Sequence, residues 1–190
     1  MTALSPTLAT PRLTLRPPLA EDAAPIARHL NDFAVAGKLA RVPFPYRLAD
    51  ARAWLASRPA ALPPEETGFS ILAEGYGLVG HVGFQRGVHG PVIGYWLGQP
   101  FWGRGLMTEA AVAAIAWFFG ASAAPVLYSG VFHFNTASLA VQHKLGFAET
   151  GRSHLLCLAR GAQVEHIDTE LTRESFTRRW PPALPSAAAR

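Results

Sequence analysis

A run of 23 residues without a charge, residues 110–132, limits what this chain can fold into more than any other feature. A run of this length is buried either in a bilayer or in the core of a folded domain. Gly120 and Pro125 interrupt it, and a proline inside a helix removes a backbone hydrogen bond and bends the chain. We therefore expect two buried elements, a helix over residues 106–119 and a strand over residues 126–132, and no membrane span.

Apolar or alternating runs separated by glycine and proline predict the remaining elements. Strands are expected at residues 12–16, 68–73, 78–84, 92–97, 148–158 and 163–171, and helices at residues 21–31, 48–57, 135–145 and 173–180. Loops are expected at residues 37–45 and 59–66. The order is strand, two helices, three-strand meander, helix, strand, helix and hairpin. This order predicts an α/β (α+β) fold, in which helices flank both faces of a central mixed sheet.

The composition fits a single domain, because 49% of the 190 residues are hydrophobic and only 16% are charged. We expect the domain to span residues 11–180, between a loose N-terminal segment (residues 1–10) and a flexible Pro/Ala-rich tail (residues 181–190). The first residues lack the basic start and apolar core of a signal peptide, so a cytoplasmic location is expected.

Charge and cysteine content make several classes of protein improbable for this chain. The net charge is +4, but the arginines are scattered, whereas a nucleic-acid-binding module carries a dense basic stripe. The single cysteine, Cys157, excludes an internal disulfide and a cysteine-rich zinc site, and it is expected to be a small buried residue. The histidines show no helical pairing with an acid that indicates zinc, so no metal is expected.

The segment from Gly98 to Gly105 joins a predicted strand to the predicted helix at residues 106–119. The first N–H groups of a helix have no partner within it, and with the helix dipole they attract a diphosphate. Gly103 and Gly105 let the backbone approach phosphate oxygens, and Arg104 is a candidate for a charge-assisted contact. The segment is not a nucleoside-triphosphate P-loop, because the required lysine is missing, and it is not a Rossmann fingerprint, because the third glycine is missing.

Two motifs stand in order along the chain. The first is Tyr95-Trp96-Leu97 followed by residues 101–110, and the second joins Asn135-Thr136-Ala137-Ser138 to Lys144-Leu145-Gly146-Phe147. Together they resemble the acetyl-CoA motifs of the GNAT superfamily of N-acetyltransferases, most of all the branch of the ribosomal-protein N-terminal acetyltransferases RimJ and RimL. Two ordered motifs are far more specific than either one. The resemblance covers roughly residues 12–171.

The resemblance implies a GNAT-like acyl-CoA N-acyltransferase fold, with acetyl-CoA as co-substrate. It implies transfer of an acetyl group to a primary amine by direct attack in a ternary complex. The implied cofactor-binding residues are Leu97, Gly98, Trp102, Gly103, Arg104, Gly105, Leu106, Met107, Thr108, Asn135 and Ser138. Backbone N–H groups around Leu97 and Gly98 are expected to hold the oxyanion, and Ser138 is the expected catalytic partner of the departing thiolate. The sequence departs from the superfamily at Trp102, usually Gln or Arg, and at Gln142, where many members have a tyrosine acid.

The general base is not evident from the sequence. The candidates are Glu74, His81, Glu149, His154 and Glu165, and a chain of water molecules is the alternative. Phe44, Tyr46 and Trp54 are expected to line an apolar acceptor pocket. The expected partner is an amine, either a small molecule or a protein N-terminus, with no nucleic acid and no membrane; a homodimer is left open. A non-catalytic acyl-CoA sensor of the same fold is the second hypothesis, which binding without turnover would identify.

Overall fold

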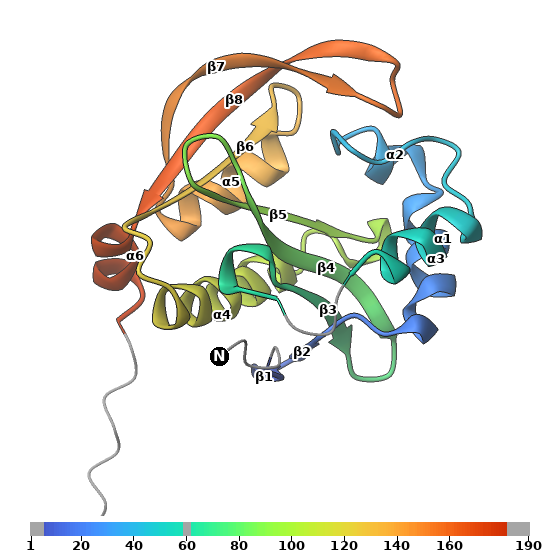
Figure 1. Ribbon diagram of the computed structural model, residues 1–190, viewed down its shortest axis with the longest axis horizontal. Coiled ribbons are helices and arrows are strands. Elements are labelled where there is room, and N and C mark those ends of the chain that lie inside the picture. The colour runs from blue at the N-terminus through green and yellow to red at the C-terminus, as the bar shows by residue number, and fades with distance from the viewer. Residues whose placement is uncertain (1–5, 59–61, 182–190) are drawn as a thin grey trace, which may run out of the picture.

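The computed structural model describes residues 6–58 and 62–181, which form one eight-stranded sheet (Figure 1). The strands are β1 (Leu8–Ala9), β2 (Leu13–Arg16), β3 (Gly68–Ala73), β4 (Gly77–Arg86), β5 (Pro91–Leu97), β6 (Val126–Phe132), β7 (Ala148–Cys157) and β8 (Ala162–Thr172). Their order across the sheet is β1-β2-β3-β4-β5-β6-β8-β7. All neighbours are antiparallel except β5 and β6, so the predicted mixed sheet is confirmed.

Helices cover both faces of this sheet, as predicted. They are α1 (Ala23–Leu30), α2 (Phe33–Ala36), α3 (Leu48–Ala56), α4 (Leu106–Ala121), α5 (Thr136–Leu145) and α6 (Arg173–Arg179). Helix α4 packs in one apolar core with Phe69 of β3 and Phe84 of β4. Helices α1 and α3 form a second core with Leu78 of β4 and Trp96 of β5. The two cores are separate because successive residues of a strand point to opposite faces.

The uncharged run folds as expected, into helix α4 and strand β6. Ala110, Ala111 and Ala114 of α4 are fully buried, and their small side chains let the helix approach the sheet closely. The helix ends at Ala121, two residues later than predicted, before Pro125. Within residues 6–58 and 62–181, none of the helices has the length and apolar character that a bilayer crossing requires.

Several local predictions differ from the structure. Strand β1 lies inside the segment predicted to be loose, because Leu8 and Ala9 pair with β2. The first predicted helix is a 3₁₀ turn, Ala20–Asp22, followed by α1, and helix α2 was not predicted. The predicted loop at residues 59–66 ends in a 3₁₀ turn, Pro64–Glu66, while residues 59–61 lie outside the described residues. So does the predicted tail beyond Pro181.

Strands β5 and β6 diverge along their length, which opens the middle of the sheet. Their only ladder pair among the described residues is Val92 with Tyr128, near the start of both strands. The β7–β8 hairpin then arches across this opening toward α2 (Figure 1). Its tip is attached there, because Leu158 N–H donates to Ala40 O at 3.0 Å and Arg160 Nε donates to Gly37 O at 2.8 Å.

Candidate active site at the opening of the sheet

The start of helix α4 presents unpartnered backbone N–H groups. Gly103 and Gly105 both have φ of 73°, in the left-handed region that glycine adopts without strain. Gly105 is the N-cap residue, and no side chain caps the helix there. The N–H groups of the first turn therefore face outward with the positive end of the helix dipole, as an anion-binding site requires.

Strand β5 directs two further N–H groups into the gap beside β6. Residues opposite one another in an antiparallel pair alternate between hydrogen-bonded and non-hydrogen-bonded pairs. Gly98 N–H donates to Val79 O of β4 at 2.9 Å, which fixes the phase of this alternation. Tyr95 and Leu97, which follow the opposite phase, direct their N–H groups away from β4.

A cavity of about 250 Å³ lies between the α4 start, the end of β5 and helix α5. It is lined by nine of the residues predicted to bind the cofactor: Leu97, Trp102, Gly103, Gly105, Leu106, Met107, Thr108, Asn135 and Ser138. The two lysines of the chain, Lys38 and Lys144, also line it, and Lys38 Nζ lies 4.1 Å from the centre of the Trp102 ring. The cavity thus combines free amides with two cations.

Two predicted cofactor residues do not line this cavity. Gly98 packs against His29, whose Nδ1 would lie 2.4 Å from a Cβ at this position, and its N–H is already donated to Val79. The oxyanion-donor role predicted around Leu97 and Gly98 therefore does not suit Gly98. The second is Arg104, whose carbonyl oxygen accepts a hydrogen bond from Arg12 Nη1 at 2.9 Å.

Glu109, one turn into α4, binds the N-terminal segment. It accepts from Thr10 Oγ1 at 2.7 Å and from Arg12 N–H at 2.9 Å. Partial burial raises its pKa, but these hydrogen bonds and the Arg12 charge outweigh burial and hold the pKa below its usual value. Its contacts are structural, and they attach β1 and β2 to the helix that presents the glycines.

A pair of hydroxyl groups lies where the gap meets α5. Ser138 Oγ donates to Tyr95 Oη at 3.1 Å, and the Tyr95 hydroxyl faces Ser138 O at 3.4 Å. Burial raises the pKa of Tyr95 to about 12, so this phenol stays protonated at neutral pH. Asn135 caps α5 as predicted, its side chain accepting from Ser138 N–H. Gln142 is buried, and its amide donates to Ser129 Oγ at 2.9 Å.

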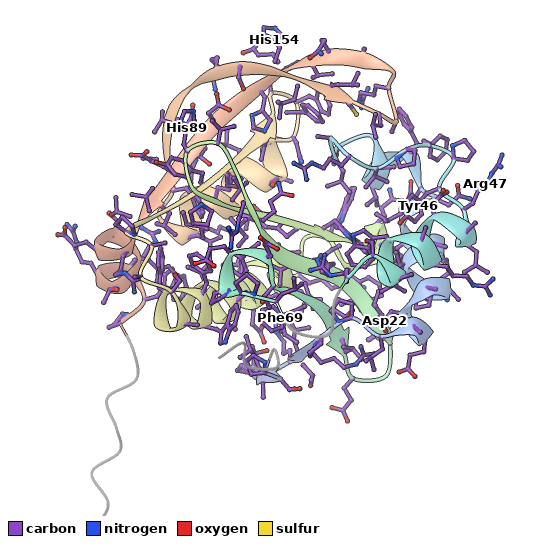
Figure 2. All side chains as sticks on the ribbon, viewed as in Figure 1. Asp22, Tyr46, Arg47, Phe69, His89 and His154 are labelled. Atoms are coloured by element: carbon purple, nitrogen blue, oxygen red, sulfur yellow. The ribbon has the colours of Figure 1, made fainter. Side chains whose placement is uncertain are left out.

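A second, larger cavity of about 1020 Å³ lies on the α1–α3 face of the sheet. It shares six lining residues with the first: Lys38, Leu39, Tyr95, Trp96, Asn135 and Ser138. Tyr46 and Trp54, two of the three residues predicted to line an acceptor pocket, line this cavity (Tyr46 is labelled in Figure 2). Phe44 does not, because its ring is exposed and packs edge-on against Phe33. The cavity is also less apolar than predicted: among the described residues, four cations and one carboxylate line it, namely Lys38, Arg41, Arg58, Arg86 and Asp168.

Only one of the predicted base candidates, His81, lines this larger cavity. Glu74 is exposed in the β3–β4 turn. Glu149 and Glu165 are each near Arg152, with N–O distances of 3.3 and 3.5 Å. His154 is exposed on the outer side of β7, where Figure 2 shows it at the margin of the molecule.

Two residues that the sequence prediction missed, His166 and Asp168 of β8, face the larger cavity. The spacing of these two residues was a usable signal, because residues two apart in a strand point to the same face of the sheet. His166 Nδ1 lies 2.8 Å from Asp168 Oδ1. Within the described ranges, no cluster of three His, Cys, Asp or Glu residues is placed to hold a metal ion.

Comparisons with known proteins point to one family. The family model described as "Acetyltransferase (GNAT) domain" matches residues 12–148. The SPbeta prophage-derived uncharacterized N-acetyltransferase YokL of Bacillus subtilis is 30% identical over 86 residues, which cover 44% of this chain and about half (49%) of that relative.

Solved structures share the fold at low identity. Mycobacterium smegmatis RimJ, solved in complex with CoA-disulfide, has a TM-score of 0.75 and 23% identity, covering 94% of this chain and 93% of its own. Ribosomal-protein-S5-alanine acetyltransferase from Vibrio fischeri has a TM-score of 0.75 and 19% identity, covering 90% and 99%. These likenesses establish the fold that the opened sheet belongs to.

Proposed function

The chain belongs to the GNAT acetyltransferase family, and from this premise we propose that it moves the acetyl group of acetyl-CoA onto a primary amine by direct attack in a ternary complex. The observation that carries the proposal is the junction of the two cavities at Tyr95, Trp96 and Ser138. A donor in the smaller cavity and an acceptor in the larger one meet there without a covalent enzyme intermediate. Holding both reactants in place supplies much of the rate.

The smaller cavity suits acetyl-CoA in three respects. The glycine turn and the α4 start offer N–H groups to the pyrophosphate, and Lys38 and Lys144 supply positive charge. The gap between β5 and β6 receives the pantetheine arm. Tyr95 and Leu97 direct their N–H groups at this gap, where they can stabilise the developing oxyanion of the thioester carbonyl.

Ser138 and Tyr95 are the groups that we assign to the leaving thiolate. When the carbon–sulfur bond breaks, the Ser138 hydroxyl turns its proton from Tyr95 Oη to the sulfur, and the protonated Tyr95 hydroxyl donates to Ser138 Oγ in turn. Because Tyr95 has a pKa of about 12, it does not ionise in the working pH range. In this proposal the phenol of Tyr95, from β5, takes the part of the tyrosine acid that is absent at Gln142.

Calorimetric titration of the purified chain with acetyl-CoA, CoA and dephospho-CoA tests the cofactor assignment. We expect micromolar binding of acetyl-CoA and CoA, and weaker binding of the ligand that lacks the 3′-phosphate. No heat at millimolar ligand would refute the assignment. If the chain binds acetyl-CoA but releases no free CoA thiol with any of a panel of peptide and small-molecule amines, the result would instead favour the acyl-CoA sensor.

A further inference from the structure

A row of glycines crosses the floor of the larger cavity. Gly68 of β3 pairs with Gly83 of β4, which pairs in turn with Gly94 of β5. Val92 of β5 and Tyr128 of β6 form a ladder pair, and Gly94 and Gly130 each lie two residues after their own member of this pair. The last three glycines of the row line the cavity. Side chains are thus missing along one line on three paired strands, and again at Gly130 across the opening between β5 and β6, so other groups can lie over the sheet there.

Two imidazole rings lie over this row, one at each side. A Cβ at Gly83 would lie 2.8 Å from His81 Nε2, and a Cβ at Gly130 would lie 2.1 Å from His166 Cε1 and 2.8 Å from His166 Nε2. Over Gly94, between the two rings, a Cβ would meet nothing within 4 Å. Gly94 is exposed although it lies in the middle of the sheet, so it marks a hollow beside Tyr95, where the two cavities meet.

The two rings differ in what holds them. His81 Nδ1 is buried without a hydrogen-bond partner among the described residues, and the ring packs edge-on against Trp54 with 5.1 Å between centroids. Burial, aided by the Arg58 charge, lowers the pKa of His81 to about 3, so this ring is a weak proton acceptor.

His166 has the partners of an oriented base. Its Nδ1 lies 2.8 Å from Asp168 Oδ1, and that oxygen also accepts from Ser153 Oγ at 2.9 Å. A carboxylate that accepts from Nδ1–H leaves the lone pair on Nε2, and Nε2 lies over Gly130, which lines the same cavity as Gly94. His166 and Gly94 line the same cavity, from β8 and β5, on either side of the opening between β5 and β6.

We propose that the acceptor amine sits over Gly94 and that His166, oriented by Asp168, is the base that takes its proton. This inference rests on the proposed function. The ammonium gives one proton to His166 Nε2, which becomes imidazolium. The freed amine lone pair forms a bond to the thioester carbon, the carbon–sulfur bond breaks, and the thiolate takes the second nitrogen proton, relayed through Ser138. The products are the amide and CoA thiol, and His166 releases its proton to water.

Bromoacetyl-CoA tests this geometry without a known acceptor. It carries an electrophilic carbon next to the acyl carbonyl, and the lone pair of a base beside the vacant amine position displaces bromide to form a carbon–nitrogen bond. We expect peptide mass spectrometry to find one label, on His166. We expect His166→Gln to abolish this label, and Asp168→Asn to slow it at least about tenfold because the carboxylate no longer fixes the tautomer. His154→Gln, a histidine on the outside of the same hairpin, should label at the wild-type rate.

Acetyl-CoA affinity, measured on the same samples by calorimetry, separates the two levels of the inference. Wild-type affinity for acetyl-CoA together with an unlabelled His166, or with the label on His81, would overturn the role of His166 and leave the proposed function standing. Absence of acetyl-CoA binding in the wild-type protein would overturn the proposed function and this inference with it. A His166→Gln variant that keeps its cofactor affinity and thermal midpoint while losing the label supports the assignment.

Discussion

Replacing Gly105 with valine should separate the folding role of the glycine turn from its role in binding. Gly105 has φ of 73° and caps helix α4, and a Cβ there would meet only Arg12 Nη2, at 3.6 Å. The added side chain therefore has room on the protein, so the strain is that of the left-handed backbone. This strain is about 1–2 kcal/mol for an ordinary L-residue, and a β-branched residue lies at the high end.

The loss of affinity should be larger than this strain. To relieve it, the Gly105→Val backbone turns toward negative φ, which rotates the first N–H groups of α4, and the isopropyl group occupies the surface that a diphosphate would approach. Two hydrogen bonds to a charged oxygen are worth roughly 3–6 kcal/mol together, which corresponds to a loss of about 10²–10⁴ in affinity.

Gly75→Val is a matched control. Gly75 has φ of 76° in the β3–β4 turn, a Cβ there meets nothing within 4 Å, and the residue lines neither cavity. Both variants should lose similar thermal stability, about 2–4 °C for each kcal/mol, but only Gly105→Val should lose acetyl-CoA binding by calorimetry. Equal affinities in the two variants would refute the assignment of this turn to the pyrophosphate.

Three other outcomes are expected. Ser138→Ala should lower kcat by about 10–100-fold, the worth of one hydrogen bond to a charged atom, with acetyl-CoA affinity unchanged by calorimetry; wild-type turnover would make Ser138 structural. Asp22→Asn should cost about 3–5 kcal/mol in urea unfolding at pH 7, because buried Asp22 accepts two hydrogen bonds of 2.8 Å from Arg16. Burial raises the pKa of Asp22, but its hydrogen bonds outweigh burial and lower the pKa overall. The stabilisation by Asp22 is therefore present above the unfolded-state pKa and is lost as pH falls through the folded-state pKa. A difference in unfolding free energy between wild type and variant that persisted in strong acid would contradict this. Four cations and one carboxylate line the larger cavity. Peptide amines with an acidic second residue should therefore show about tenfold higher kcat/KM than peptides with a neutral second residue at low salt. A preference that did not shrink with added salt would contradict an electrostatic origin.

The parts of the fold that could be predicted from the sequence are those with a strong local signal. The uncharged run predicted α4 and β6 because a run of this length without a charge is mostly buried in a folded domain. The β3–β4–β5 meander followed from glycine turns between apolar runs. Strand β1 and helix α2 were missed because elements of two and four residues are too short to show a periodic pattern.

The donor site was more predictable than the acceptor site for a related reason. The glycine turn, the α4 start and the Asn135 cap each belong to one continuous segment, so spacing alone indicated them. The larger cavity is assembled from β4, β5, β6, β8 and the loop before α3, and no single segment contains its pattern. His166 and Asp168 were overlooked although they alternate correctly, because only the tertiary structure shows which face of β8 meets the cavity.

The one ladder pair that the described part of the chain shows between β5 and β6 has a consequence for how the protein unfolds. The sheet consists of two halves, β1–β5 and β6–β8, which are joined by Val92 and Tyr128, by α4 and α5, and at the far side by the hairpin tip at Arg160. A ligand arm in the gap would accept hydrogen bonds that a neighbouring strand would otherwise accept. In the free protein we therefore expect amide protons of β5 near Tyr95 and Leu97 to exchange quickly. With acetyl-CoA bound they should exchange slowly, because the two halves of the sheet then open as one cooperative unit.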